Sequence, residues 1–156
     1  MKIRKAGIDD LETLQRFNQE LCLKENMEFD KTIDTEYSST DSAIRYYKKS
    51  IENDSYISLI AEEEGVPIGY LIGVIYKSEG YRNILDLGEV QNMYVQEDLR
   101  GKGIGSALMN YFKDWCRERE VERIRVIASF DNKETIEFYK KVGFNEYDLV
   151  LEGDLK

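Results

Sequence analysis

The sequence predicts an α/β fold, because segments with strand periodicity alternate with segments of helical periodicity. In residues 89–115 a half-apolar strand is followed by a charged turn, a glycine-rich loop and an amphipathic helix. Residues 56–76 indicate two strands joined by a tight turn. The chain has 156 residues, 42% of them hydrophobic, which is enough for one substantial core, so we expect a single domain over residues 1–156.

Composition excludes several classes of function. The net charge of −9 argues against nucleic acid, whose phosphates require a basic surface. No histidine is present, so serine–histidine and cysteine–histidine catalysis are excluded, and proton transfer falls to carboxylate, tyrosine, lysine or water. Cys22 and Cys116 are far apart and match no metal or redox spacing, so we expect free thiols and no metal.

No apolar run approaches the length that spans a membrane, and the first residues lack the apolar core of a signal peptide. We therefore expect a cytoplasmic protein without a membrane partner.

The first third of the chain predicts a strand, a helix and a loop. Residues 2–6 indicate a short strand, and Asp9 with Glu12 indicates a variant capping box at the start of a helix. Apolar residues recur at helical spacing as far as about Leu23. Residues 24–40 have no periodicity and predict a loop that includes at most a short helical turn.

Residues 42–52 predict a second helix, capped by Thr40 or Asp41. It is followed by a hairpin of strands at residues 56–62 and 68–76, whose turn contains Gly65.

The central strand at residues 90–95 leads to the loop at residues 100–105, and an amphipathic helix follows. Glycines let backbone N–H groups converge, and the helix N-terminus adds partial positive charge, so this order predicts a phosphate-binding site. The loop lacks the Lys-Ser or Lys-Thr of a P-loop. Ser106 stands where a dinucleotide fingerprint requires its third glycine.

The last third predicts a strand at residues 122–129 and a helix that starts at Asp131–Asn132 and ends at Gly143. In residues 147–152 the apolar side chains of Tyr147, Leu149 and Leu151 alternate with Asp148, Val150 and Glu152. This pattern predicts a closing strand.

Two motifs occur in order and are separated by one strand. The first is R-x-x-G-x-G, and the second is N-x5-F-Y-x3-G-F. Their residues are Arg100, Gly103, Gly105, Asn132, Phe138, Tyr139, Gly143 and Phe144. In these motifs the chain resembles the GNAT superfamily of N-acetyltransferases, most clearly over residues 57–144.

The resemblance implies a GNAT fold: a mixed, mostly antiparallel sheet with helices on both faces. It implies direct transfer of an acetyl group from acetyl-CoA, the co-substrate, to an amine of a small molecule or peptide, without an acyl-enzyme. Dimers are frequent in the family, so a homodimer is also expected. Two alternatives stay open: a non-catalytic module that senses CoA or a metabolite, and an acetyltransferase directed at proteins or ribosomes.

The resemblance also assigns a cofactor site. The family holds the pantetheine arm with a bulged central strand, expected here around residues 92–94, and the pyrophosphate with the glycine loop. The residues that it places against acetyl-CoA are Met93, Tyr94, Val95, Arg100, Gly101, Lys102, Gly103, Ile104, Gly105, Ser106, Asn132 and Tyr139.

The resemblance suggests two catalytic residues. Glu89 is the expected general base, directly or through water, because an alkyl ammonium with a pKa of about 10 must lose its proton before it attacks a thioester. A water chain, with Glu89 as a solvent-facing carboxylate, is the alternative. Tyr139 is the expected acid for the departing thiolate, and the alternative is that it fills the interface between helix and sheet.

The acceptor side is expected between residues 24 and 51. Phe29, Tyr37 and Tyr46 could frame a charged amine by cation–π attraction, or could pack on the sheet.

Overall fold

The computed structural model of the chain describes residues 1–155, and the end of the predicted domain at residue 156 lies outside the described residues. Helices and strands follow one another in the predicted order as far as α4. In chain order they are β1 (Lys2–Lys5), α1 (Leu11–Glu28), α2 (Asp41–Glu52), β2 (Tyr56–Glu63), β3 (Val66–Lys77), β4 (Asp86–Val95), α3 (Ile104–Arg117), β5 (Arg123–Val126) and α4 (Lys133–Lys141).

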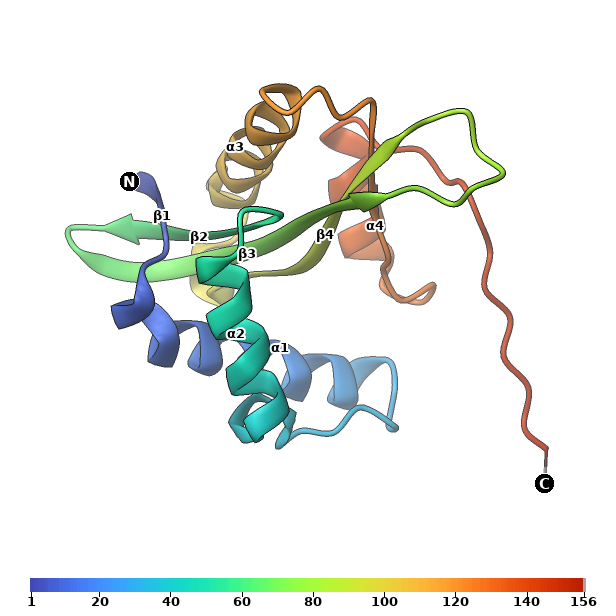
Figure 1. Cartoon of the computed structure of the whole chain (residues 1–156). Helices are drawn as coiled ribbons and strands as arrows, with labels where there is room; N and C mark the ends of the chain where they lie inside the picture. Colours follow the sequence, from blue (N-terminus) through green and yellow to red (C-terminus); the bar gives the residue numbers. More distant parts are fainter. Residues whose placement is uncertain (156) are drawn as a thin grey trace.

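The five strands form one sheet in the order β1-β2-β3-β4-β5. Each neighbouring pair from β1 to β4 is antiparallel, and β4 and β5 are parallel. Helix α3 lies on one face of the sheet, and α1 and α2 lie on the other (Figure 1). The predicted mixed, mostly antiparallel sheet with helices on both faces is therefore confirmed.

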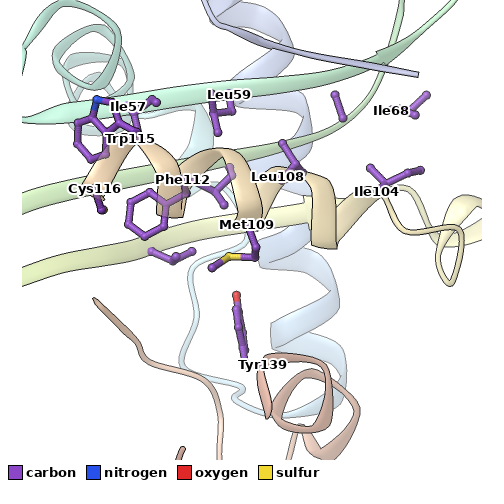
Figure 2. Packing of buried hydrophobic residues seen from close by; sticks show 13 residues of the cluster. Ile57, Leu59, Ile68, Ile104, Leu108, Met109, Phe112, Trp115, Cys116 and Tyr139 are labelled. Carbon is purple, nitrogen blue, oxygen red and sulfur yellow. The ribbon is translucent and has the colours of Figure 1, made fainter. Parts of the chain in front are cut away.

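Each face of the sheet has its own apolar core. Under α3 the core contains Leu108 and Phe112 of the helix, Leu71 of β3 and Tyr139 of α4. Figure 2 shows Leu108 and Phe112 on α3 and the hydroxyl end of Tyr139 pointing toward Met109. On the opposite face, residues of α1 and α2 pack on β2 and β3. The buried members of this second core are Leu14, Phe17, Ala43, Tyr47, Ile60, Tyr70 and Ile72.

The start of α1 differs from the prediction. The predicted cap was Asp9 with Glu12, but α1 follows a short 3-10 turn, Ile8–Asp10, and no described side chain caps its first turn. The Oδ2 of Asp10 instead accepts the backbone N–H of Gly7 at 2.8 Å and closes that turn. The guanidinium of Arg4 donates to the same oxygen at 2.7 Å. Arg4 on β1 thus holds the carboxylate of Asp10 in this position. A capping pattern read from neighbouring residues does not include this contact with a distant strand.

Helix α1 is also longer than predicted, since it continues past Leu23 to Glu28. Lys24 and Glu28 form an ion pair of 2.7 Å one turn apart, an arrangement that supports a helix where apolar periodicity has ended. The remaining loop contains one short helical turn, Tyr37–Ser39.

The predicted second helix and hairpin are confirmed. Thr40 caps α2, and its hydroxyl accepts the N–H of Ala43 at 3.2 Å. The turn between β2 and β3 has Glu64 at a φ of 51° and Gly65 at 82°, the left-handed conformations that a tight hairpin requires.

The predicted closing strand is wrong for the single chain. Residues 145–155 form no helix or strand, and Figure 1 shows the end of the chain running away from the body. The strand predicted at residues 122–129 is shortened to Arg123–Val126. An alternating apolar pattern forms a strand only where another strand pairs with it, and none of the described strands pairs with residues 147–152.

Close approach of α3 to the sheet depends on glycines in the strands. A Cβ added at Gly73 of β3 would overlap the ring of Phe112, and one added at Gly88 of β4 would lie 2.8 Å from the Sγ of Cys116. Both positions therefore require glycine for space rather than for backbone conformation.

We predict that Gly73→Ala lowers the free energy of unfolding by about 1–3 kcal/mol, because the added methyl group must displace the Phe112 ring from a closely packed core. Urea denaturation followed by circular dichroism measures the change. Gly80→Ala is the control, since Gly80 is exposed with nothing within 4 Å of an added Cβ. Equal stability of the two variants would contradict this packing.

Candidate active site

The sheet opens between β4 and β5. Their pairing extends from Leu87 with Arg123 to Val90 with Val126 and then stops. Strand β4 continues to Val95, paired with β3 alone. Within residues 1–155, the part of β4 after Val90 therefore has an edge with no neighbouring strand on the β5 side. Such an edge presents backbone donors and acceptors that an extended ligand can use.

A bulge marks the place where the strands separate. The register between β3 and β4 shifts so that Gln91 is the extra residue, slightly before the bulge predicted at residues 92–94. Side chains from the helices hold it. Tyr46 of α2 donates to the Oε1 of Gln91 at 2.8 Å and accepts from the Nδ2 of Asn92 at 2.9 Å, and Asn18 of α1 donates to the Oδ1 of Asn92 at 3.3 Å.

The three residues predicted against the pantetheine arm form the end of this open strand. Met93 and Val95 pack toward the α3 core, and Tyr94 packs on the opposite face beside Phe17, with ring centroids 6.0 Å apart. Burial raises the pKa of Tyr94 to about 12, and a hydrogen bond with Glu20 contributes. The side chains of Met93, Tyr94 and Val95 are thus packed in the two cores. Their backbone groups on the open edge are the part that a ligand can reach.

The glycine loop has the backbone geometry that an anion cradle requires, and its binding of a phosphate stays a prediction. Gly101 and Gly103 have φ values of 74° and 84°, which a residue with a Cβ rarely adopts. The N–H of Ala107 is bonded to the carbonyl of Gly103 at 3.0 Å, and no side chain caps the helix. The first backbone N–H groups of α3, those of Ile104, Gly105 and Ser106, therefore precede the helical hydrogen bonds and are available to an anion.

Other residues of the loop differ in their roles. Arg100 donates from Nε to the carbonyl of Val95 at 3.1 Å and lies 5.4 Å from the ring centre of Tyr94, so it braces the loop against β4. Lys102 is exposed. A Cβ at Gly105 would lie 3.2 Å from the ring of Phe138, so glycine here also lets α3 approach α4.

Helix α4 places Asn132 and Tyr139 on one face, two turns apart, and both side chains are buried. The Oδ1 of Asn132 accepts the N–H of Thr135 at 3.1 Å, which caps the helix and leaves its amide N–H₂ as a donor. Burial, and to a lesser degree the charge of Glu25, raises the pKa of Tyr139. Its phenol thus keeps its proton at neutral pH and can donate a hydrogen bond.

Glu25, near the end of α1, was not predicted as a site residue. The Nδ2 of Asn132 donates to its Oε1 at 3.4 Å, so this carboxylate on the α1 face meets the polar residues of α4. Burial raises the pKa of Glu25 and makes it more basic than an exposed glutamate. Because the sequence pattern ended the helix at Leu23, Glu25 fell in the expected loop, and no local signal identified it.

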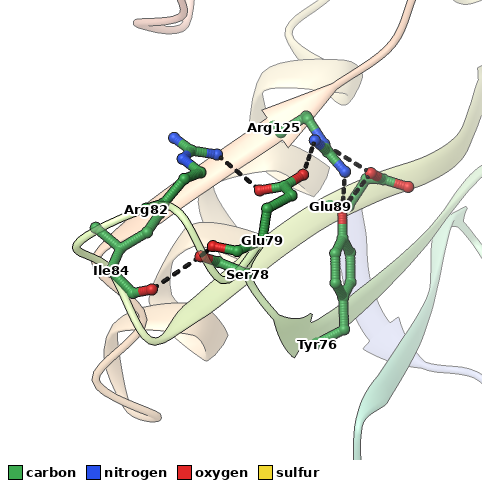
Figure 3. Close-up of polar contacts among 7 residues, drawn as sticks. All are labelled: Tyr76, Ser78, Glu79, Arg82, Ile84, Glu89 and Arg125. Carbon is green, nitrogen blue, oxygen red and sulfur yellow. Dashed lines mark hydrogen bonds and ion pairs between the residues drawn. The ribbon is translucent and has the colours of Figure 1, made fainter.

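Glu89 has strong partners. Its Oε2 accepts from the Nε of Arg125 at 2.9 Å and from the hydroxyl of Tyr76 at 2.7 Å, and Arg125 also pairs with Glu79 at 3.0 Å (Figure 3). Arg125 also donates to the Tyr76 hydroxyl. Burial, then the bond to Glu89, raises the pKa of Tyr76 to about 12. Tyr76 and Arg125 both donate to the Oε2 of Glu89, and these bonds compete with a proton for that oxygen. The role of Glu89 as a base stays a prediction.

Of the three predicted acceptor aromatics, Tyr46 reaches the bulge through the hydrogen bonds above. Phe29 lies at the C-terminal cap of α1, and Tyr37 is 39% exposed on a short helical turn. In the described part of the chain, the hydroxyl of Tyr37 makes no hydrogen bond to β4.

No helix within residues 1–155 is long and apolar enough to cross a membrane. In the same residues, no three side chains of the histidine, cysteine, aspartate or glutamate types are grouped as metal ligands. Cys22 and Cys116 are free thiols.

The fold and the site define an α/β protein in which a glycine loop follows the open strand edge of a splayed sheet. A sequence model of the Acetyltransferase (GNAT) family matches residues 21–144, and the chain belongs to this family.

The chain is 30% identical to the uncharacterized N-acetyltransferase MJ1207 of Methanocaldococcus jannaschii over 154 residues, which are 95% of this chain and 62% of that protein. The chain thus spans less than two thirds of that relative.

Among solved structures, a predicted acetyltransferase of Clostridium acetobutylicum with acetyl-CoA has a TM-score of 0.77 and 26% identity, over 99% of this chain and 96% of that one. An aminoglycoside N-acetyltransferase, AAC(6′)-Iy, in complex with CoA has a TM-score of 0.77 and 16% identity, over 99% of both chains.

We predict that Glu25→Gln raises the melting temperature at pH 8 and that this gain disappears toward pH 4. A carboxyl whose pKa is raised by folding binds its proton more tightly in the folded state, so the wild type loses stability as pH rises above the ordinary glutamate pKa. Glutamine has no charge to bury. Thermal unfolding across this pH range measures the effect, and Glu36→Gln, at an exposed position, is the control. A lower melting temperature for Glu25→Gln at pH 8 would contradict the assignment.

Proposed function

We propose that this chain is an N-acetyltransferase that transfers the acetyl group of acetyl-CoA directly to a cationic amine of a small molecule or peptide. The open edge of β4 after Val90 is the observation that carries this proposal. The glycine loop follows its end, and Tyr139 of α4 shares a core with Met93 and Val95 of the strand. This arrangement suits a long ligand with a pyrophosphate at one end and a reactive thioester at the other.

The chain's own groups fit acetyl-CoA along its length. The backbone N–H groups of residues 104–106 and the positive end of α3 suit the pyrophosphate. The backbone of residues 93–95 suits the amides of the pantetheine arm, which would pair with it as a strand does. The amide of Asn132 makes a long bond to Glu25 and can exchange it for one to the ligand.

The proposed chemistry needs a base, a polarised carbonyl and a donor to the leaving sulfur. Glu25 meets Asn132 and has a raised pKa, so it is our first candidate for accepting the proton of the ammonium, and Glu89 is the candidate suggested by family resemblance. Backbone donors of the open strand would polarise the carbonyl. Tyr139 keeps its proton, so it would stabilise the departing thiolate as a hydrogen-bond donor.

Charge supports a cationic acceptor. Glu20 and Glu25 both lie on α1, and the whole chain has a net charge of −9. The likeness to an aminoglycoside N-acetyltransferase and to a structure with acetyl-CoA agrees with an amine acceptor and with acetyl-CoA as co-substrate.

We predict that Tyr139→Phe lowers kcat about 100-fold, because the leaving thiolate loses its donor while the apolar ring is kept. The assay is release of CoA thiol from acetyl-CoA with polyamines, amino acids, aminoglycosides and peptide N-termini as acceptors. Tyr81→Phe is the control, since Tyr81 is 84% exposed. Binding of acetyl-CoA without release for any acceptor would instead favour a sensing module, and release only with proteins or ribosomes would favour the macromolecular alternative.

We further predict that Glu25→Gln lowers kcat/KM at least 100-fold at neutral pH and removes the acidic limb of its pH profile, because the variant has no carboxylate to accept the proton of the ammonium. Glu89→Gln should retain that limb. The two pH profiles, measured with the same acceptor, distinguish the candidates. A limb that persists in Glu25→Gln and vanishes in Glu89→Gln would assign the base to Glu89.

A further inference from the structure

A chain of side-chain hydrogen bonds runs from the core under α1 and α2 to the bulge of β4. It begins at Asn18 of α1, which is 4% exposed, and passes through Asn92 and Tyr46 to Gln91. Gln91 is exposed and is the extra residue of the bulge. The chain therefore joins a buried amide to an amide that a ligand can reach.

Each bond of this chain has a direction. The Nδ2 of Asn18 donates to the Oδ1 of Asn92 at 3.3 Å, and the Nδ2 of Asn92 donates to the hydroxyl of Tyr46 at 2.9 Å. A hydroxyl carries one proton, and Tyr46 gives it to the Oε1 of Gln91 at 2.8 Å. Because the oxygen of the Gln91 amide points to Tyr46, its N–H₂ group points away from Tyr46.

The buried neighbours of Asn18 hold the start of the chain in this direction. The Oδ1 of Asn18 accepts from the hydroxyl of Tyr47 at 2.8 Å and from the Sγ of Cys22 at 3.6 Å. Its Nδ2 also donates to the hydroxyl of Tyr70 at 3.1 Å. Burial raises the pKa of both phenols, so each keeps its proton. A reversal of the Asn18 amide would require these buried groups to turn together, and a satisfied network resists that.

The position of Gln91 brings this oriented donor to the acceptor side of the site. Pairing of β4 with β5 ends at Val90, so Gln91 is the first residue of the open part of β4. Tyr46, its partner, lies on α2 within the segment 24–51 where the acceptor is expected, and it packs against the core of that face. Within residues 1–155 the Gln91 side chain makes no hydrogen bond besides the one from Tyr46. Its N–H₂ group is thus an oriented donor without a partner in the described chain.

We propose that Gln91 selects acceptor amines that also carry a hydrogen-bond-accepting oxygen, a hydroxyl or a carbonyl, near the amine. The inference rests on the proposed function and names the acceptor class within it. The N–H₂ group of Gln91 donates to that oxygen while the amine lies at the open strand. A site that bonds a polar group of its substrate discriminates against an analogue that lacks the group. Alkyl amines and polyamines without oxygen are therefore poorer acceptors. Tyr46 and Asn18 are positioning residues, because they act through Gln91.

Gln91→Glu is the substitution that tests the proposal. A carboxylate still accepts the proton of Tyr46, so the chain is kept, but its other oxygen repels the oxygen of the acceptor. The readout is kcat/KM for ethanolamine and for glycinamide, each divided by kcat/KM for propylamine. Comparing these ratios between the wild type and the variant cancels the different intrinsic reactivities of the amines. We expect a fall of about tenfold, on the scale of one hydrogen bond, and the two arms distinguish a hydroxyl from a carbonyl acceptor.

Asn110→Asp is the matched control, because Asn110 is exposed on α3, across the sheet, and receives the same added charge. Its ratios should equal those of the wild type. Tyr46→Phe keeps Gln91 but removes the hydroxyl that orients it, so its ratios should fall less than those of Gln91→Glu. Circular dichroism checks that each variant is folded. Unchanged ratios in Gln91→Glu overturn the proposal, and so does an equal fall in Asn110→Asp, because charge alone would then explain it.

A measurement without turnover separates this proposal from the proposed function. The side-chain N–H₂ signals of Gln91 in isotope-labelled protein are assigned by their loss in Gln91→Glu. With CoA present, ethanolamine or glycinamide should shift these signals in nuclear magnetic resonance spectra, and propylamine should not. If no acceptor is acetylated but this shift occurs, the proposed function fails and recognition by Gln91 stands. Signals that respond to none of the amines, or equally to all three, overturn the proposal.

Discussion

The separation of β4 from β5 after Val90 is the constraint on which the rest of the site depends. Strand β4 stays paired with β3 to its end, while β5 stops at Val126, so one strand edge lies open inside an otherwise continuous sheet. An open edge in a protein interior is costly unless its backbone groups find partners. In the proposed function, acetyl-CoA supplies them.

A buried polar network fixes where that separation begins. Asn18 of α1 accepts from the hydroxyl of Tyr47 at 2.8 Å and donates to Tyr70 at 3.1 Å, and it also donates to Asn92 beside the bulge. Every polar side-chain atom buried in residues 1–155 has a hydrogen-bond partner. Satisfied networks of this kind rigidify a core. Helices α1 and α2 therefore hold the bulge of β4 in place.

Local motifs could be predicted from the sequence, and features that depend on distant partners could not. The glycine loop and the α4 face with Asn132 follow from spacing and capping within a few residues. The bulge at Gln91 depends on the register between β3 and β4. The place of Glu25 depends on the extension of α1 to Glu28 and on the contact of Glu25 with Asn132 of α4. The pattern at residues 147–152 predicted a strand that the structure does not form, because a strand requires a partner that the described residues of the single chain do not provide.

The most direct measurement is hydrogen–deuterium exchange of the full chain with and without acetyl-CoA. The account predicts slower exchange in β4 at residues 93–95 and at the start of α3, residues 104–106, because the ligand would bond these backbone groups. The exposed turn at Gly65 should be unchanged. Exchange in both segments that is unaffected by saturating acetyl-CoA would contradict the claim that the open edge of β4 is the cofactor site.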